Sequence, residues 1–190
     1  MSTHIPTGTA GPWSITRIEV EQIGDAMPGC GLDQAEPGTY TALVHDTRGV
    51  VSCDSPVLIE DQMPVVEKAQ GHILLGGLGI GLALEMLLDV EEVRRITVVE
   101  LDMDVIRLVG PSFDNEKVTF VNHDVLEMPS VAIDPDLDRV WLDVWDTDRP
   151  ETLEDRLYAI ADWGEHCAWV KAAALPRVFA KADRLMRDGA

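Results

Sequence analysis

Hydrophobic and polar positions follow different patterns in two parts of the chain. Before residue 71, apolar positions alternate with polar ones, which is typical of strands with one buried face. The alternation predicts a strand over 13–23 and a hairpin over 39–54. A helix is expected next, because Ser55 is a suitable N-cap and Pro56 fits the first helical position. Pro64 lies inside that helical pattern, so we expect a kinked helix or two short ones.

From residue 71 onward the apolar positions form continuous runs instead. Such runs are typical of parallel strands that are buried on both faces by the helices between them. The pattern predicts four strands with two intervening helices, the strands at 72–77, 94–101, 117–124 and 138–145 and the helices at about 79–89 and 102–110.

The last part of the chain has a third pattern. After Asp146 the sequence predicts helix, interrupted near Gly164 and Pro176, and no strand. Three segments are therefore expected. They are an N-terminal extension of strands, hairpin and helix over 1–70, an α/β core over 71–146 and a helical tail over 147–190.

The composition excludes several classes of protein. The 190 residues carry a formal net charge of −19, and such a surface repels phosphate backbones, so no bulk nucleic-acid binding is expected. The charge suits a cationic small molecule, although many proteins are simply acidic. No apolar segment is long enough for a membrane span, and residues 1–14 lack the regions of a secretion signal. The three scattered cysteines and five histidines predict no metal site and indicate a reducing, cytoplasmic environment.

Four glycines lie within six residues at the end of the first continuous strand, at Gly76, Gly77, Gly79 and Gly81. Each costs backbone entropy on folding, so packing alone rarely concentrates glycine in this way. A strand that passes through a glycine turn into a helix forms a binding place for a nucleotide-like ligand. From Gly77 the spacing is G-x-G-x-G rather than the G-x-G-x-x-G of dinucleotide-binding proteins. It resembles motif I of the class I S-adenosylmethionine-dependent methyltransferases.

This resemblance implies a Rossmann-like, mostly parallel sheet in a shortened form of the family fold, with S-adenosylmethionine or S-adenosylhomocysteine as cofactor. In the family an acid after the second strand binds the ribose hydroxyls, and Glu100 stands at that place. The resemblance also implies that Asp124 is the acid near the adenine and that Asp143 lies beside the reacting atoms. The resemblance thus implies nine cofactor-binding residues: Gly77, Leu78, Gly79, Gly81, Glu100, Leu101, Asp124, Val125 and Asp143.

Each of these features also has an interpretation that needs no ligand. Glu100 can cap the following helix, and Asp124 can be an ordinary turn residue. The segment 143–146 can be a structural strand end, and the glycines can serve packing alone.

Within the class, the chain most resembles the spermidine synthase branch, which also has β-structure before the glycine loop. In that branch one aspartate deprotonates the attacking amine and a second holds the polyamine cation. The matching catalytic residues here are Asp143 and Asp146. The chain departs from the branch at Ile80, where the family has an acid, and at Leu58 and Ser52, where it has tyrosine and glutamine.

The sequence also lacks a counterpart for the family's later strands. In the family order the fourth strand is interior, so its outer edge would be unpaired without a fifth. We expect the hairpin, the helical tail or a second subunit to cover this edge, and we expect a homo-oligomer.

Three functions stay open on the sequence alone. The first is a methyltransferase that acts on a small-molecule acceptor with Asp143 as base. The second is an aminopropyltransferase that uses decarboxylated S-adenosylmethionine, which the apolar Ile80 would accommodate. The third is a non-catalytic module that keeps the donor site as a scaffold.

Overall fold

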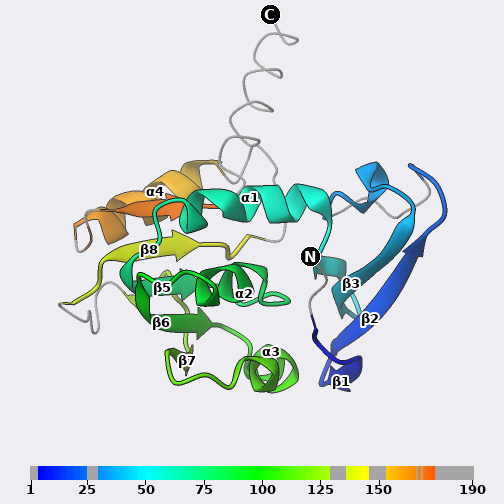
Figure 1. Cartoon of the computed structure of the whole chain (residues 1–190), viewed down its shortest axis with the longest axis horizontal. Coiled ribbons are helices and arrows are strands. Elements are labelled where there is room, and N and C mark those ends of the chain that lie inside the picture. The colour runs from blue at the N-terminus through cyan, green and yellow to red at the C-terminus, as the bar shows by residue number, and fades with distance from the viewer. Residues whose placement is uncertain are drawn as a thin grey trace, which may run out of the picture.

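The computed structural model describes residues 4–24, 30–128, 136–145, 153–165, 167 and 169–173. Asp146 lies outside them. Figure 1 shows the order of the elements along the chain. The strands are β1 Gly8–Ala10, β2 Trp13–Val20, β3 Gly38–His45, β4 Gly49–Cys53, β5 Gly71–Gly76, β6 Val93–Glu100, β7 Val118–Asn122, β8 Arg139–Leu142 and β9 Val170–Ala172. The helices are α1 Pro56–Val66, α2 Leu82–Leu88, α3 Met103–Val109 and α4 Leu153–Gly164, with short 3-10 helices at Leu32–Gln34 and Gly110–Phe113.

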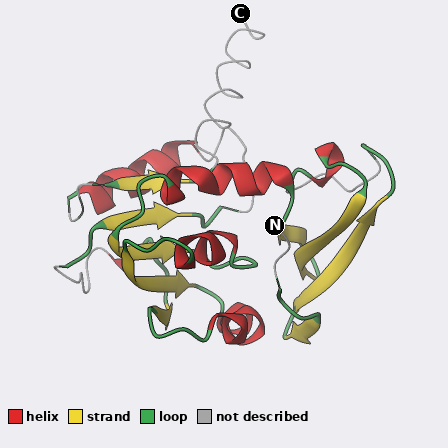
Figure 2. Ribbon diagram, in the orientation of Figure 1, coloured by secondary structure: helices red, strands yellow, loops and turns green. Residues whose placement is uncertain are grey.

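The first four strands form an antiparallel sheet in the order β1-β2-β3-β4. Strand β2 pairs with β3 from Trp13 opposite His45 to Val20 opposite Gly38, so the predicted strand ends three residues early. Strands β3 and β4 form the predicted hairpin. In Figure 2 this sheet stands beside the second sheet, and helix α1 extends from the side of the antiparallel sheet across the parallel one.

Helix α1 begins as the sequence predicts. The Ser55 hydroxyl accepts the N–H of Leu58 at 3.3 Å, and Pro56 occupies the first turn. The helix continues through Pro64 to Val66, so the alternative of two short helices is wrong. Pro64 lies two residues before the end of the helix, so little of the helix follows it.

The remaining five strands form a parallel sheet in the order β7-β6-β5-β8-β9. This arrangement confirms the α/β, Rossmann-like fold. The strand order reverses at β5, because β6 and β7 lie on one side of it and β8 and β9 on the other. In open sheets of this kind, ligands bind beyond the carboxyl ends of the strands at such a switch point.

Two hydrophobic clusters cover the two faces of the parallel sheet. Alternate residues of β5 enter different clusters, as a strand requires. Ile73 and Leu75 pack with helices α1, α2 and α3 and with the antiparallel sheet, whereas Leu74 packs with α4. The antiparallel sheet therefore shares the main core, and in Figure 1 it stands beyond the ends toward which β5, β6 and β8 point.

The tail contains a strand that the sequence analysis missed. Strand β9 pairs in parallel with β8, so the expectation of a tail without strands is wrong. Its three residues, Val-Lys-Ala, adjoin an alanine-rich segment with good helix propensity, and sheet pairing overrides that propensity here. The tail thus covers the outer edge of β8, but with a strand and not with the helix that was expected.

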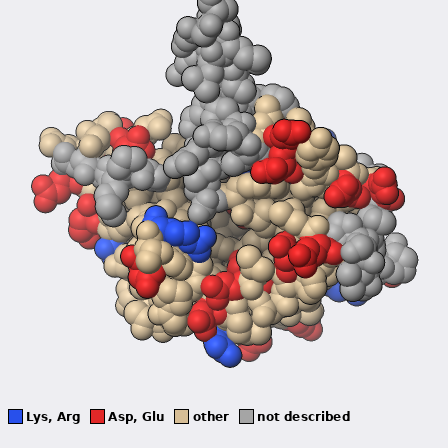
Figure 3. All heavy atoms as spheres, turned by 180° about the vertical axis from the view of Figure 1, so that it is seen from behind, with Lys and Arg blue, Asp and Glu red and all other residues tan. Residues whose placement is uncertain are grey.

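No helix among the described residues is long and apolar enough to cross a membrane. Acidic side chains are spread over the face shown in Figure 3, while basic ones gather in a few places. The charge of the chain is therefore distributed over this face rather than confined to one patch.

Candidate functional site

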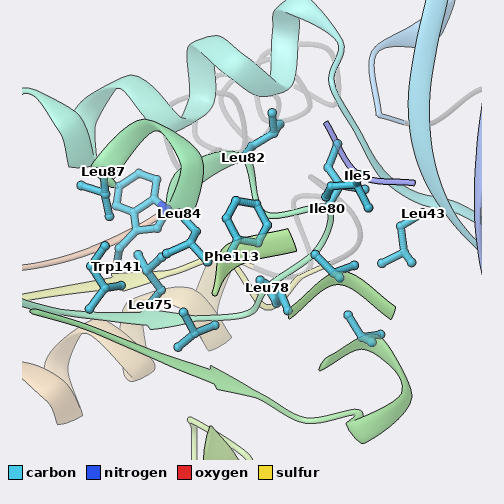
Figure 4. Close-up of a cluster of buried hydrophobic side chains, with 14 of the residues drawn as sticks. Ile5, Leu43, Leu75, Leu78, Ile80, Leu82, Leu84, Leu87, Phe113 and Trp141 are labelled. Atoms are coloured by element: carbon cyan, nitrogen blue, oxygen red, sulfur yellow. The ribbon is translucent and has the colours of Figure 1, made fainter. Parts of the chain in front are cut away.

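The loop after β5 places main chain at the surface and its side chains in the core. Leu78 and Ile80 are buried, and Ile80 lies beside Ile5 of the N-terminal segment (Figure 4). Gly77 and Gly79, which alternate with them, are partly exposed. Among the described residues, no hydrogen-bond partner is present for the N–H of Gly79 or Ile80. Gly79 is partly exposed, so its N–H is available to a molecule at the outer side of the loop, whereas Ile80 is 0% exposed and its N–H is enclosed.

The protein's own packing also requires glycine in this loop. Gly77, Gly79 and Gly81 have φ angles of 92°, 53° and 78°, in the left-handed region that side chains disfavour. A Cβ atom on Gly77 would overlap the carbonyl of Asp143, and one on Gly81 would overlap the ring of Phe113. The packing interpretation accounts for these glycines without a ligand, so they alone do not identify the site.

Glu100 ends β6 next to this loop and is tied to it. Its Oε2 accepts the N–H of Leu78 at 2.9 Å, and its Oε1 accepts the N–H of Asp102 at 2.9 Å. Burial raises the pKa of Glu100 above its ordinary value, and the backbone hydrogen bonds offset part of this effect. The next helix is instead capped by Asp102, whose Oδ1 accepts the N–H of Asp104. The carboxylate of Glu100 thus accepts Leu78 on one oxygen and Asp102 on the other, with a smaller contribution from the N–H of Leu101, and lone pairs are left over.

Exposed apolar side chains flank Glu100 and the turn after β7. Leu101 is 68% exposed and Leu126 is 43% exposed. Val125, the expected contact, is only 2% exposed and packs in the second core, beneath Gly76. The Oδ1 atom of Asp124 accepts the N–H of Leu126 at 2.9 Å, which is the geometry of a turn residue. Leu126 was missed in the sequence, although it is an apolar residue inside a polar turn.

Asp143 follows β8 and adjoins the glycine loop from the other side. Its N–H donates to the carbonyl of Gly76 at 2.7 Å, and its Oδ2 accepts Nε2 of Gln62 at 2.8 Å. The buried Trp141 donates its indole N–H to Oε1 of Gln62 at 2.8 Å. Because an indole nitrogen can only donate, this bond fixes the amide so that its nitrogen faces Asp143.

Gln62 is a second residue that the sequence analysis missed. It lies on α1 and is buried, between apolar neighbours such as Leu58 and Val65. A glutamine on the apolar face of a helix was a signal that a buried polar partner exists. Asp146, the second expected catalytic residue, is outside the described residues.

The antiparallel sheet is fastened to the same region. Trp13 of β2 donates its indole N–H to Oδ2 of Asp102 at 2.7 Å, and the guanidinium of Arg48 lies 4.7 Å from the centre of the Trp13 ring. Asp102 in turn donates its N–H to Glu100. The hydrogen bonds therefore run from the antiparallel sheet to the carboxylate beside the glycine loop.

The structure brings most of the expected residues to the carboxyl ends of the parallel strands. The loop 77–81, Glu100 and Asp143 follow the neighbouring strands β5, β6 and β8, while Asp124 follows the more distant β7. In the described part of the chain, no group of three His, Cys, Asp or Glu residues is placed to hold a metal ion. A separate hollow is lined by His72, Arg94 and residues 136–138. It lies at the start of β5, away from the carboxyl ends of the strands.

Comparisons with known proteins give remote likenesses. No protein-family model matches the chain, and no curated protein matches it in sequence. Spermidine synthase from Thermotoga maritima resembles it with 17% identity and a TM-score of 0.48, over 83% of this chain and 51% of that one. A spermidine synthase in complex with the transition-state analogue AdoDATO matches over the same shares at 17% identity, with a TM-score of 0.49. TrmN from Thermus thermophilus matches at 12% identity and a TM-score of 0.49, over 67% of this chain and 41% of that one.

The chain spans about half the length of the spermidine synthases that it matches. These identities and TM-scores are too low to transfer an activity, a substrate or a ligand from those proteins to this one.

Proposed function

We propose that the chain is an S-adenosylmethionine-dependent transferase, specifically a methyltransferase with a small-molecule acceptor. The observation that carries this proposal is the placement of Glu100. It stands at the carboxyl end of β6, next to β5, where the strand order reverses. Its carboxylate accepts the N–H of Leu78 in the glycine loop. The proposal also rests on the G-x-G-x-G spacing.

The residues present fit an adenosyl compound. Glu100 keeps lone pairs for two ribose hydroxyls, which only a carboxylate can accept compactly. Leu101 and Leu126 offer exposed apolar surface for a purine ring, and the free N–H of the partly exposed Gly79 suits the polar end of the donor. S-adenosylmethionine would supply an electrophilic methyl group on a sulfonium.

The chain's own part in transfer would be alignment and proton removal. Asp143 adjoins the loop from the β8 side, so an acceptor between Asp143 and the donor would face the methyl carbon. The bound donor would supply the methyl group as its carbon–sulfur bond breaks, and Asp143 would take the proton of a protonated nucleophile. Gln62 would orient the carboxylate by its 2.8 Å hydrogen bond.

Titration calorimetry with S-adenosylhomocysteine tests the proposal. Binding of one molecule per chain is the expected result, and absence of binding of both this compound and S-adenosylmethionine overturns it. Incubation with decarboxylated S-adenosylmethionine and putrescine, followed by analysis for spermidine, separates the aminopropyltransferase alternative. Donor binding in a chain whose biological role survives Asp143→Ala would indicate the non-catalytic alternative.

A further inference from the structure

Two of the three cysteines meet where the antiparallel sheet joins α1. Cys53 is the last residue of β4 and is 0% exposed. Its thiol donates to the carbonyl of Cys30, with 3.3 Å between sulfur and oxygen. The Cys30 thiol donates to the carbonyl of Val50 on the same strand, with 3.7 Å between the two atoms. Each sulfur is thus directed at the segment that carries the other.

The backbone holds Cys30 against the end of β4. Among the described residues, Cys30 is the one non-glycine residue with a positive φ, at 55°. Its carbonyl accepts the thiol of Cys53 and also the hydroxyl of Ser55, the N-cap of α1. These bonds fasten the Cys30 turn to the junction of β4 and α1, so the two cysteines stay together in the folded chain.

The contact also changes the chemistry of the buried sulfur. The Cys30 thiol lowers the pKa of Cys53, because it can donate to the Cys53 thiolate in place of the Val50 carbonyl, although burial acts in the opposite direction. The thiolate is the species that attacks a disulfide. Cys30 is partly exposed, and therefore accessible, while Cys53 is enclosed.

We propose that Cys30 and Cys53 form a reversible dithiol–disulfide pair. The oxidant we name is a small-molecule disulfide such as glutathione disulfide. The Cys30 thiolate attacks one of its sulfurs, which forms a mixed disulfide and releases one glutathione thiolate. The Cys53 thiolate then attacks the Cys30 sulfur, forms the protein disulfide and releases the second glutathione. The two protein thiols lose two electrons and two protons, and glutathione disulfide gains them.

The bond would act on a region next to the glycine loop. Ser52, the neighbour of Cys53, lies so close to Gly79 that a Cβ on the glycine would be 2.8 Å from the serine oxygen. A covalent link would fix the end of β4, and with it the position of Ser52. This pairing stands apart from the transferase proposal, because it depends only on the two thiols.

Peptide mapping of the full chain tests the pair. Trypsin cleaves after Arg17, Arg48 and Lys68, so Cys30 lies in peptide 18–48 and Cys53 in peptide 49–68. Cys167, which is buried in the second core, lies in peptide 157–171. After incubation of the native protein with glutathione disulfide, alkylation and digestion without reductant, we expect peptides 18–48 and 49–68 to be linked. Peptide 157–171 should be alkylated and unlinked.

Variants and reversal complete the test. Cys53→Ser should leave Cys30 as a mixed disulfide with glutathione, and Cys167→Ser should form the same link as the native chain. Dithiothreitol should release the link, and the oxidised chain should unfold at a higher temperature than the reduced one. A stable mixed disulfide at Cys30 in the native chain, a link to Cys167 or no oxidation at all would each overturn the proposal.

Discussion

Replacement of Glu100 by glutamine should weaken donor binding. Glu100→Gln keeps the size of the side chain and removes the charge. The amide retains one acceptor oxygen, whereas the carboxylate serves both the Leu78 and the Asp102 N–H groups. One of these donors then faces an NH₂ group, and the ribose hydroxyls lose a charged acceptor.

The expected loss of affinity follows from the hydrogen bonds at stake. A hydrogen bond to a charged group contributes about 1.5–3 kcal/mol, and a neutral one about 1 kcal/mol. Two ribose hydroxyls that change from a charged to a neutral acceptor lose about 3 kcal/mol in total. This corresponds to a dissociation constant for S-adenosylhomocysteine that rises roughly 100-fold.

Calorimetry at pH 7.5 measures the change in the dissociation constant. In ~150 mM salt, charges more than ~8 Å apart are largely screened. Glu92→Gln is the matched control, because Glu92 is exposed just before the other end of β6 and loses the same charge. The control should bind as the native chain does. If Glu100→Gln keeps an affinity within about threefold of the native value, Glu100 does not hold the ribose and the reasoning fails.

Three further results are expected. Burial raises the pKa of Glu100, so acid should protonate it, and weaken donor binding, at a higher pH than for an ordinary glutamate. The ligand-free chain should instead lose stability as the pH rises through this raised pKa, because the buried carboxyl is more stable when protonated. Binding titrations and thermal melts across pH 4–8, a range that brackets the ordinary glutamate pKa of about 4.3, check both signs. Gly77→Ala should lower the free energy of unfolding by about 3 kcal/mol or more, because the new Cβ would overlap the carbonyl of Asp143. Gly49→Ala should lower it by only about 1–2 kcal/mol, because Gly49 also has a positive φ but a Cβ there would have no atom within 4 Å. Equal losses in urea unfolding would refute the overlap with Asp143. Gln62→Leu should cost about 2 kcal/mol in the same assay, since it leaves the buried indole N–H of Trp141 unpaired, and an unchanged midpoint would contradict this.

The sequence predicted the parallel core because its signals are local. The apolar runs that become β5, β6, β7 and β8 leave little choice of element, and the caps at Ser55 and Asp102 are visible as residue types. The glycine positions, Glu100 and Asp143 could be predicted to lie together, because the carboxyl ends of parallel strands lie on the same side of the sheet.

What the sequence could not predict depends on contacts between distant residues. Strand β9 exists because β8 offers an unpaired edge, which no property of Val170–Ala172 reveals. The hydrogen bond from Gln62 to Asp143 joins residues 81 positions apart, and the one from Trp13 to Asp102 joins residues 89 apart. Val125 and Leu126 both suited an apolar contact, and only the turn geometry decides which one is exposed.

The short strand at the end of the described chain has a consequence for biosynthesis. Strand β8 leaves the ribosome well before β9, and until β9 docks, one side of the nascent sheet presents open backbone groups. An open strand edge of this kind is a template for pairing with another chain, including a second copy on the same polysome. The interval between the synthesis of these two strands is therefore a period in which this protein is exposed to misassembly.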